Sequence, residues 1–182
     1  MKKILLQITT VTFLFTVISA FVYYKTSLDV LLTIAISCGT TFYHFFMRLV
    51  VGHTVNFVLN NQVNYRHKWF QLRNCEEKLY TKWKVKVWKE RLPTYDPSLF
   101  SLKKHSFHEI AQAMCQAEIV HELIVLFSFL PLLFSIPFGA FPVFFVTSVS
   151  AAAYDAIFVI IQRYNRPRII RLAHRSKTRH KA

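Results

Sequence analysis

The sequence predicts an all-α integral membrane protein with four transmembrane helices, and three observations lead to this class. Of the 182 residues, 53% are hydrophobic, and the mean hydropathy of +0.30 is high for a soluble domain. Apolar runs alternate with basic segments, and 23 Lys and Arg against 9 Asp and Glu leave a formal net charge of +14. Because no nucleic-acid-binding motif accompanies this charge, it indicates contact with phosphates of lipids or of a charged substrate.

The apolar runs predict spans at about residues 4–24, 28–47, 117–136 and 141–162, since about 20 apolar residues cross a bilayer. The last two come from one long run, and Pro137–Pro142 near its middle predicts a tight turn. Pro131 is expected to kink the third helix. The chain is interpreted as a single membrane domain of residues 1–182, in which a cytoplasmic or interfacial segment covers residues 48–116 and a basic tail covers residues 163–182.

The basic residues predict the orientation of these spans. Twelve of the 23 lysines and arginines lie between Arg48 and Lys104, and eight lie between Arg163 and Lys181. Since basic loops stay in the cytoplasm, both termini are expected there (N-in/C-in), in a multi-pass protein of the cell (inner or plasma) membrane. The first run also resembles a signal peptide with a cleavage site near Ala20, but its length favours an uncleaved anchor.

The segment between the second and third spans is too long for a simple connection. Lysines alternate with apolar residues over Lys82–Val87, which predicts a short strand or an extended segment at the interface. Trp69, Trp83 and Trp88 lie among lysines and suit the headgroup zone. Ser106 to Glu109 has the pattern of a capping box that opens a helix.

Ionisable side chains are rare in membrane-spanning segments and usually have a function there. Several lie in the predicted spans or directly beside them, near the cytoplasmic ends: His44, Arg48, Glu118, His121, Glu122, Asp155 and Arg163. Glu118, His121 and Glu122 share one helix face because they are spaced i, i+3, i+4. The common depth of the whole set predicts a shared polar pocket near the inner leaflet.

Two interpretations of the third helix stay open. In the first, His121 takes a proton from a hydroxyl and Glu118 orients the imidazole. In the second, Glu118 and Glu122 form structural ion pairs with Arg48 or Arg163, and His121 is a buried, hydrogen-bonded neighbour. No metal site is predicted, because carboxylate-bridged sites need two Glu-x-x-His motifs and this chain has one. Cys115 alone is weak evidence for a nucleophile.

The segment Gln162–Arg168, "QRYNRPR", follows the fourth apolar run. Attraction to anionic lipid explains a basic tail, but it does not explain Gln162, Tyr164 and Asn165. The residue before a proline is disfavoured in the helical conformation, so Arg166–Pro167 predicts the end of the helix. Arginines at a helix C-terminus are stabilised there and can bind phosphate or carboxylate groups.

Three segments, "KLYTKWKVKVWK", "QAEIVHE" and "QRYNRPR", occur in this order between Tyr65 and Leu172. Together they resemble the bacterial glycosyl-4,4'-diaponeurosporenoate acyltransferase family. The resemblance implies a small membrane enzyme of staphyloxanthin-type carotenoid biosynthesis that esterifies a sugar hydroxyl of the glycosylated lipid with a fatty acyl chain. It also implies that the family's Glu and His fall on Glu118 and His121, and that its polar cluster falls on residues 162–168.

From these residues we predict a membrane O-acyltransferase with His121 as general base and Glu118 orienting it. Arg163, Arg166 and Arg168 would bind phosphates, and Asn165 or Gln162 would donate to the developing oxyanion. The expected substrate-binding residues are Gln162, Arg163, Tyr164, Asn165, Arg166, Arg168, Trp83 and Asp155. No cofactor is expected, since the acyl donor, such as acyl-CoA or an acyl carrier protein, is a substrate. Asp155 has no counterpart in the family pattern, so the acceptor lipid could differ.

The alternative from another class is a non-enzymatic accessory protein that binds anionic membrane lipid through its basic loop. In that case lysine should replace Arg163, Arg166 and Arg168 without loss, whereas an arginine site requires the two-pronged guanidinium. A small transporter is disfavoured, because the polar groups lie at one depth only.

Overall fold

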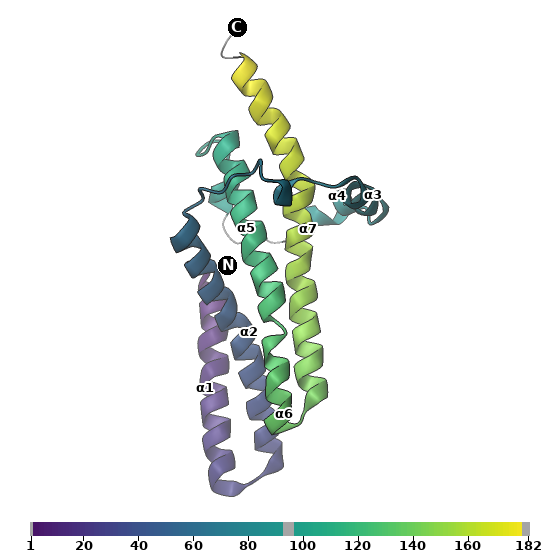
Figure 1. Ribbon diagram of the computed structural model, residues 1–182. Helices are drawn as coiled ribbons and strands as arrows, with labels where there is room; N and C mark the ends of the chain where they lie inside the picture. Colours follow the sequence, from purple (N-terminus) through teal and green to yellow (C-terminus); the bar gives the residue numbers. More distant parts are fainter. Residues whose placement is uncertain (1, 93–96, 180–182) are drawn as a thin grey trace. The chain divides into compact units, whose positions relative to one another are not determined.

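The computed structural model describes residues 2–92 and 97–179 (Figure 1). The last basic residue of the tail, Lys181, therefore lies outside the described residues. Within these residues every regular element is helical, as the sequence predicted. The elements are α1 (Lys2–Thr26), α2 (Asp29–Leu59), η1 (Lys68–Phe70), α3 (Asn74–Lys82), α4 (Val85–Trp88), η2 (Lys89–Arg91), η3 (Pro97–Phe100), α5 (Phe107–Phe127), η4 (Leu130–Phe134), α6 (Ser135–Phe138) and α7 (Phe141–Arg179).

Four helical stretches are long and apolar enough to cross a membrane: Lys3–Thr26, Asp29–Leu59, Phe107–Phe138 and Phe141–His174. Their number and order agree with the expected spans, but the helices are longer than the apolar runs. As a result α2 continues past Arg48, and α7 continues through residues 162–168. The polar residues of both segments are therefore held on regular helices rather than in loops.

The chain divides into two compact units, and the first comprises the residues up to His53 together with Leu123–Asp155. In this unit the Phe13 ring of α1 lies 5.2 Å from the Phe42 ring of α2. A Cβ on Gly39 would meet the Thr16 methyl at 3.4 Å, so the two helices approach closely there. The Tyr43 hydroxyl donates to the Phe127 carbonyl at 2.9 Å. Large apolar side chains such as Phe21, which is 62% exposed, face outward, as expected of a surface that meets lipid.

The second unit comprises Thr54–Glu122 and the chain from Ala156 onward. Its core is a cluster of buried side chains from α5 and from the segment around η1, with partly buried side chains of α2 and α7 packed against it. The buried members are Val63, Tyr65, Phe70, Ala111 and Cys115. The predicted capping box is confirmed, because the Ser106 backbone N–H donates to Glu109 Oε2 at 2.7 Å and α5 begins at the next residue.

The turn expected at Pro137–Pro142 is also present. α6 ends at Phe138 and α7 begins at Phe141, with Gly139 (φ 64°) and Ala140 (φ 48°) in between. Pro131, which was expected to kink the third helix, lies in η4, a 3-10 turn that follows the end of α5. The proline interrupts the α-helical hydrogen-bond ladder there, and the chain tightens into 3-10 geometry instead of bending within one continuous helix.

The prediction of a short strand or extended segment at Lys82–Val87 is wrong. This segment contains the end of α3 and the start of α4, separated by Lys84 in the left-handed conformation (φ 52°). Val85 is fully buried, whereas Val87 is 64% exposed. The apolar residues therefore do not share one face, as a strand would require, and the alternation over six residues was too short to distinguish the two structures.

The predicted helix end at Arg166–Pro167 is also wrong, because Pro167 lies inside α7. Proline has no N–H and crowds the carbonyl of the residue four positions earlier, here Arg163, at a cost of about 3 kcal/mol. The Arg163 and Arg166 side chains on the same turn are both ion-paired to Glu118. These long-range contacts hold the turn in helical form and offset the local cost.

We expect Pro167→Ala to stabilise the protein, because an alanine N–H can donate to the Arg163 carbonyl. One added hydrogen bond is worth about 1 kcal/mol, which corresponds to a rise of about 2–4 °C in the midpoint of thermal unfolding for a chain of this size. Circular dichroism of the detergent-solubilised protein measures the shift. A lower midpoint would mean that the proline itself supports the geometry of this turn.

Candidate active site

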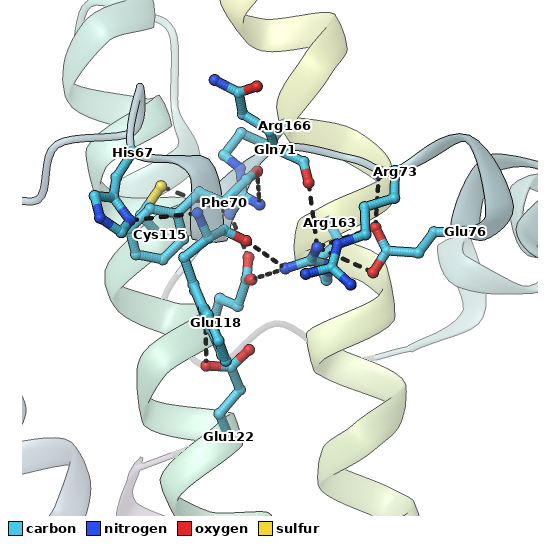
Figure 2. A network of polar contacts seen from close by, with 11 residues as sticks. His67, Phe70, Gln71, Arg73, Glu76, Cys115, Glu118, Glu122, Arg163 and Arg166 are labelled. Atoms are coloured by element: carbon cyan, nitrogen blue, oxygen red, sulfur yellow. Dashed lines mark hydrogen bonds and ion pairs between the residues drawn. The ribbon is translucent and has the colours of Figure 1, made fainter.

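Glu118 on α5 lies at the centre of a buried charge cluster in the second unit. Its side chain is completely buried. Oε1 accepts a hydrogen bond from Arg163 Nη1 at 2.6 Å, and Oε2 accepts one from Arg166 Nη1 (Figure 2). The two arginines are three residues apart on α7, so both guanidinium groups leave the same helix face. The ion pair of Glu118 with Arg163, which the sequence had left as one of two interpretations, is therefore present.

The two arginines also bind three consecutive backbone carbonyls. Arg163 donates to the carbonyls of Trp69 at 3.0 Å and Gln71 at 3.3 Å, and Arg166 donates to that of Phe70 between them. The Arg166 guanidinium also lies 5.2 Å from the Phe70 ring centroid. Together with the Glu118 ion pairs, these bonds fix the segment around η1 against α5 and α7. We call Glu118, Arg163, Arg166 and the carbonyls of residues 69–71 the arginine clasp.

Glu76 extends the arginine clasp to α3. Arg163 Nη2 lies 3.0 Å from Glu76, and the Glu76 carboxylate also accepts from the Arg73 backbone N–H at 2.8 Å, at the start of the helix. Partial burial favours the neutral form of the carboxyl, but the bonds and charges of Arg163 and Arg73 outweigh it and lower the pKa of Glu76. Arg163 thus joins two carboxylates and two carbonyls at once.

The other two polar residues on this face of α5 have different neighbours. Glu122 accepts a hydrogen bond from the Trp69 indole N–H at 3.1 Å. The half-buried His121 ring is stacked on Phe158 of α7, with 4.9 Å between the ring centroids and 14° between the planes. The Phe158 ring covers one face of the imidazole. The two ring nitrogens lie on the edge of the imidazole, so they take no part in the stacking.

Tyr164 and Asn165 contact the segment that follows α3. Lys89 Nζ donates to Asn165 Oδ1 at 2.6 Å and lies 5.0 Å from the Tyr164 ring centroid. Tyr80 packs edge-on against Tyr164, with 6.4 Å between the centroids. Residues 163–166 of α7 are thus a platform on which η1, α3 and η2 are held, which explains why the cluster contains an amide and a phenol as well as arginines.

Comparison with known protein families places these residues in context. The model of the glycosyl-4,4'-diaponeurosporenoate acyltransferase family matches residues 66–175, more than half of the chain. The chain belongs to this family. No curated protein and no solved structure matches the chain.

The matched range contains the whole arginine clasp, His121 and the segment 162–168, so the resemblance seen in the sequence motifs is confirmed. The family is one of glycosyl-carotenoid acyltransferases, and the protein is accordingly an acyltransferase of carotenoid biosynthesis. Membership implies esterification of a carotenoid glycoside by an acyl donor. The matched residues are therefore those in which to look for its active site.

The remaining expected substrate-binding residues lie in different settings. Gln162 is half-buried and Arg168 is exposed on α7. Trp83 caps the C-terminus of α3, is 49% exposed, and accepts a bond from the Trp88 indole at its carbonyl. Asp155 belongs to the first unit, where it is 1% exposed and forms an ion pair with Arg48. Of the charged residues expected to share one pocket, Arg48 and Asp155 form an ion pair in the first unit, and Glu118 and Arg163 form one in the second.

Cys115 is fully buried, and its sulfur lies 3.6 Å from Arg166 Nη1.

Two cavities, of about 300 and 460 Å³, open in the second unit, and both are lined by Gln62 and Gln112. None of the expected site residues lines either cavity. Among the described residues no group of three or more His, Cys, Asp or Glu side chains is arranged to hold a metal ion.

Apart from Glu118, sequence reasoning missed the partners of the arginines. Glu76 lies 87 positions before Arg163, and Trp69, Phe70 and Gln71 take part mainly through backbone carbonyls, which carry no sequence signal. A local sign did exist for Glu76: it lies three residues after Arg73, at the start of a helical pattern, where acidic residues are favoured.

We expect Glu118→Gln to destabilise the protein strongly, because it leaves the buried Arg166 guanidinium without a carboxylate and leaves Arg163 with Glu76 alone. Breaking a buried charge pair costs about 3–5 kcal/mol, which corresponds to a fall of roughly 10 °C in the thermal midpoint. Glu77→Gln is the matched control, since this side chain is exposed on α3 and should change little. Equal midpoints for the two variants would contradict the central role of Glu118.

The lowered pKa of Glu76 predicts that the attachment of α3 depends on pH. Because the folded pKa lies below the ordinary value of 4.5, the contact stabilises the protein fully above that value and is lost as pH falls through the folded pKa. Hydrogen exchange of residues 74–82, corrected for intrinsic rates, should therefore speed up below about pH 4.5 in the wild type. Glu76→Gln should exchange faster at neutral pH and lose the pH dependence; a dependence that survives this substitution would assign it to another group.

Proposed function

We propose that the protein transfers a fatty acyl group to a sugar hydroxyl of a glycosylated lipid, a glycosyl-carotenoid by family membership, with His121 as the general base. The observation that carries this proposal is the position of His121 in the family-matched region. It lies on α5 one turn from the arginine clasp and is half-buried beside an aromatic ring. An imidazole in a partly apolar setting, with its nitrogens on the ring edge, suits proton transfer near neutral pH.

The reaction needs two proton transfers, one from the sugar hydroxyl to His121 and one from His121 to the leaving group of the donor. His121 takes the proton of the sugar hydroxyl while the hydroxyl oxygen attacks the acyl carbonyl carbon. The tetrahedral intermediate carries the negative charge on the former carbonyl oxygen. When it collapses, the bond to the donor's leaving group breaks, and the protonated imidazole returns its proton to that group. The products are the acylated sugar and the free donor thiol, if the donor is acyl-CoA or an acyl carrier protein.

The other expected residues take supporting parts in this proposal. Gln162 or Asn165 would donate to the oxyanion; the contact of Asn165 Oδ1 with Lys89 leaves the amide N–H₂ as the donor end. Arg168, exposed on α7, is suited to phosphate of the donor. The orientation of His121 by Glu118 stays a prediction. What the arginine clasp supports is an indirect role, in which Glu118 fixes α5 and α7 through Arg163 and Arg166.

The proposed topology has both termini and the segment 48–116 on the cytoplasmic side of the cell membrane, following the positive-inside rule. The basic residues of that segment and of the tail support this orientation. A cytoplasmic active site would have direct access to acyl-CoA or an acyl carrier protein, while the polyene of the acceptor stays in the bilayer.

The alternative, a lipid-binding accessory protein, would use an exposed surface that is both apolar and basic. Leu79, Trp83 and Val87 are 39%, 49% and 64% exposed among exposed lysines, which suits a surface that lies on anionic headgroups. An enzyme that acts on a membrane lipid also needs a surface that lies on the headgroups, so this surface does not distinguish the two functions. Replacing Arg163 or Arg166 by lysine does not separate them either, because both arginines hold the fold.

Mass spectrometry of lipid and pigment extracts tests the proposal. Cells that lack the gene are complemented with wild type or with His121→Ala. Extracts with wild type should contain a glycosyl-carotenoid or other glycolipid heavier by one acyl group, and the His121→Ala extracts should show at least a hundredfold less, as expected for loss of a general base.

Equal protein levels and thermal midpoints of the two forms are required as the control. Normal acylation by His121→Ala would end the assignment of the general base. No acyl-shifted species with wild type, in a host that supplies glycosylated carotenoid, would favour the accessory protein.

A further inference from the structure

The first unit contains a polar stripe along α2 and α7 that the proposed reaction does not use. The Arg48 guanidinium donates to Asp155 Oδ2 through Nε at 3.0 Å and also through Nη2. Within this unit α2 and α7 run in the same direction (Figure 1). The ion pair therefore sets the register of the two helices: the Asp155 carboxylate lies level with the Arg48 guanidinium, which also donates to the His44 carbonyl at 3.1 Å.

This register brings His44 and Ser148 to similar levels. His44 is four residues before Arg48, or about 6 Å along α2, and Ser148 is seven residues before Asp155, or about 10.5 Å along α7. Counted in residues from the ion pair, their levels differ by about 4.5 Å, and both residues lie within two helical turns of it. Both side chains are buried, with exposures of 4% and 0%. The buried α7 positions between Ser148 and Asp155 are Ala151 and Ala152, whose methyl groups cannot bond to an imidazole.

Both polar side chains lack a hydrogen-bond partner among the residues that the structure describes. This holds for Nδ1 and Nε2 of His44 and for the hydroxyl of Ser148. Neighbouring buried hydroxyls of the unit behave differently: Thr40 bonds to the Ile36 carbonyl at 3.0 Å and Ser128 to the Ile124 carbonyl at 2.7 Å. In an apolar helix a hydroxyl normally bonds to its own backbone in this way. Unpaired buried donors and acceptors are costly and rare, so these two groups call for an external partner.

We propose that His44 and Ser148 form a binding site for an uncharged carbonyl oxygen of an ester or thioester carried on a long apolar chain. A neutral imidazole has one donor, and so does the serine hydroxyl, and one carbonyl oxygen can accept from both. Among the described residues, the charged groups that act on His44 are Arg48 and Asp155, which form an ion pair with each other. The site therefore suits a neutral group rather than a phosphate, and the apolar side chains of the unit suit the chain that carries it.

This inference rests on the proposed function for the identity of its ligand. Both substrates of the proposed reaction have the required group. The family's acceptor is a sugar ester of a long polyenoic acid, and an activated fatty acyl donor is a thioester. The site would hold one of them by its carbonyl, at the point where the apolar chain meets the polar head.

A binding experiment on the purified full chain in detergent tests the site without turnover. The probes are a glucose ester of a polyenoic acid and a polyene hydrocarbon of equal length without the ester. Bound polyene is measured by its visible absorption after removal of free probe. Wild type should prefer the ester over the hydrocarbon by roughly tenfold, as expected for a buried hydrogen bond.

His44→Phe keeps the ring volume but removes the hydrogen-bonding atoms, so it should abolish this preference while binding of the hydrocarbon persists. Ser148→Ala should reduce the preference and serves as the second variant if His44→Phe fails to fold. Thr40→Val is the matched control, because the Thr40 hydroxyl is already bonded within its own helix. An unchanged preference for the ester in His44→Phe or, if that variant does not fold, in Ser148→Ala would overturn the proposal.

Competition identifies the source of the carbonyl. Displacement of the glucose ester from wild type by a fatty acyl pantetheine thioester, with no such effect in the folded site variant, assigns the site to the donor; no displacement assigns it to the acceptor. The binding experiment distinguishes failure of this site from failure of the proposed acyl transfer. His121→Ala should keep the ester preference, so an ester preference without any acyl transfer retains this site and rejects the reaction.

Discussion

The pairing of one buried carboxylate with two guanidinium groups is the interaction on which the second unit depends. Removing a charge from water is costly, and Glu118 would be unfavourable at its buried position without a cation. Two arginines would leave the local charge positive, but Glu76 supplies a second carboxylate to Arg163, and the carbonyls of residues 69–71 accept further guanidinium N–H groups. Each partner therefore requires the others, and together they hold α5, α7 and η1 at fixed distances.

This arrangement changes the meaning of the "QRYNRPR" motif. A cluster of arginines after an apolar helix suggests a site that receives anions from outside. Here Arg163 and Arg166 receive their carbonyl and carboxylate partners from within the chain, while Tyr164 and Asn165 hold the neighbouring lysine. The motif builds a rigid frame at the polar end of α7, and the half-buried His121 lies on a helix that this frame holds in place.

Local patterns in the sequence were enough for the features that local physics decides. The four apolar runs, the capping box at Ser106 and the turn at Gly139 all follow from neighbouring residues, and all are present. α7 passes through Pro167 because of ion pairs to a residue 45 and 48 positions away, which no local pattern contains.

The same limit applies to the two candidate sites. Glu118 and Arg163 could be paired from the sequence because unlike charges in apolar helices must find each other. Ser148 could not be singled out, since a serine in an apolar run normally bonds to its own helix. Its unbonded hydroxyl is visible only once the packing of the first unit is known.

The two-residue connection between α6 and α7 has a consequence for how the protein enters the membrane. From Pro137 to Pro142 the chain has no charged side chain, and only Gly139 and Ala140 separate the two helices. In the proposed topology, the part that crosses the bilayer is therefore almost entirely apolar, so no hydrated loop has to be translocated. α5 to α7 can partition from the insertion machinery as one helical hairpin, with Glu118 on one arm and its arginines on the other.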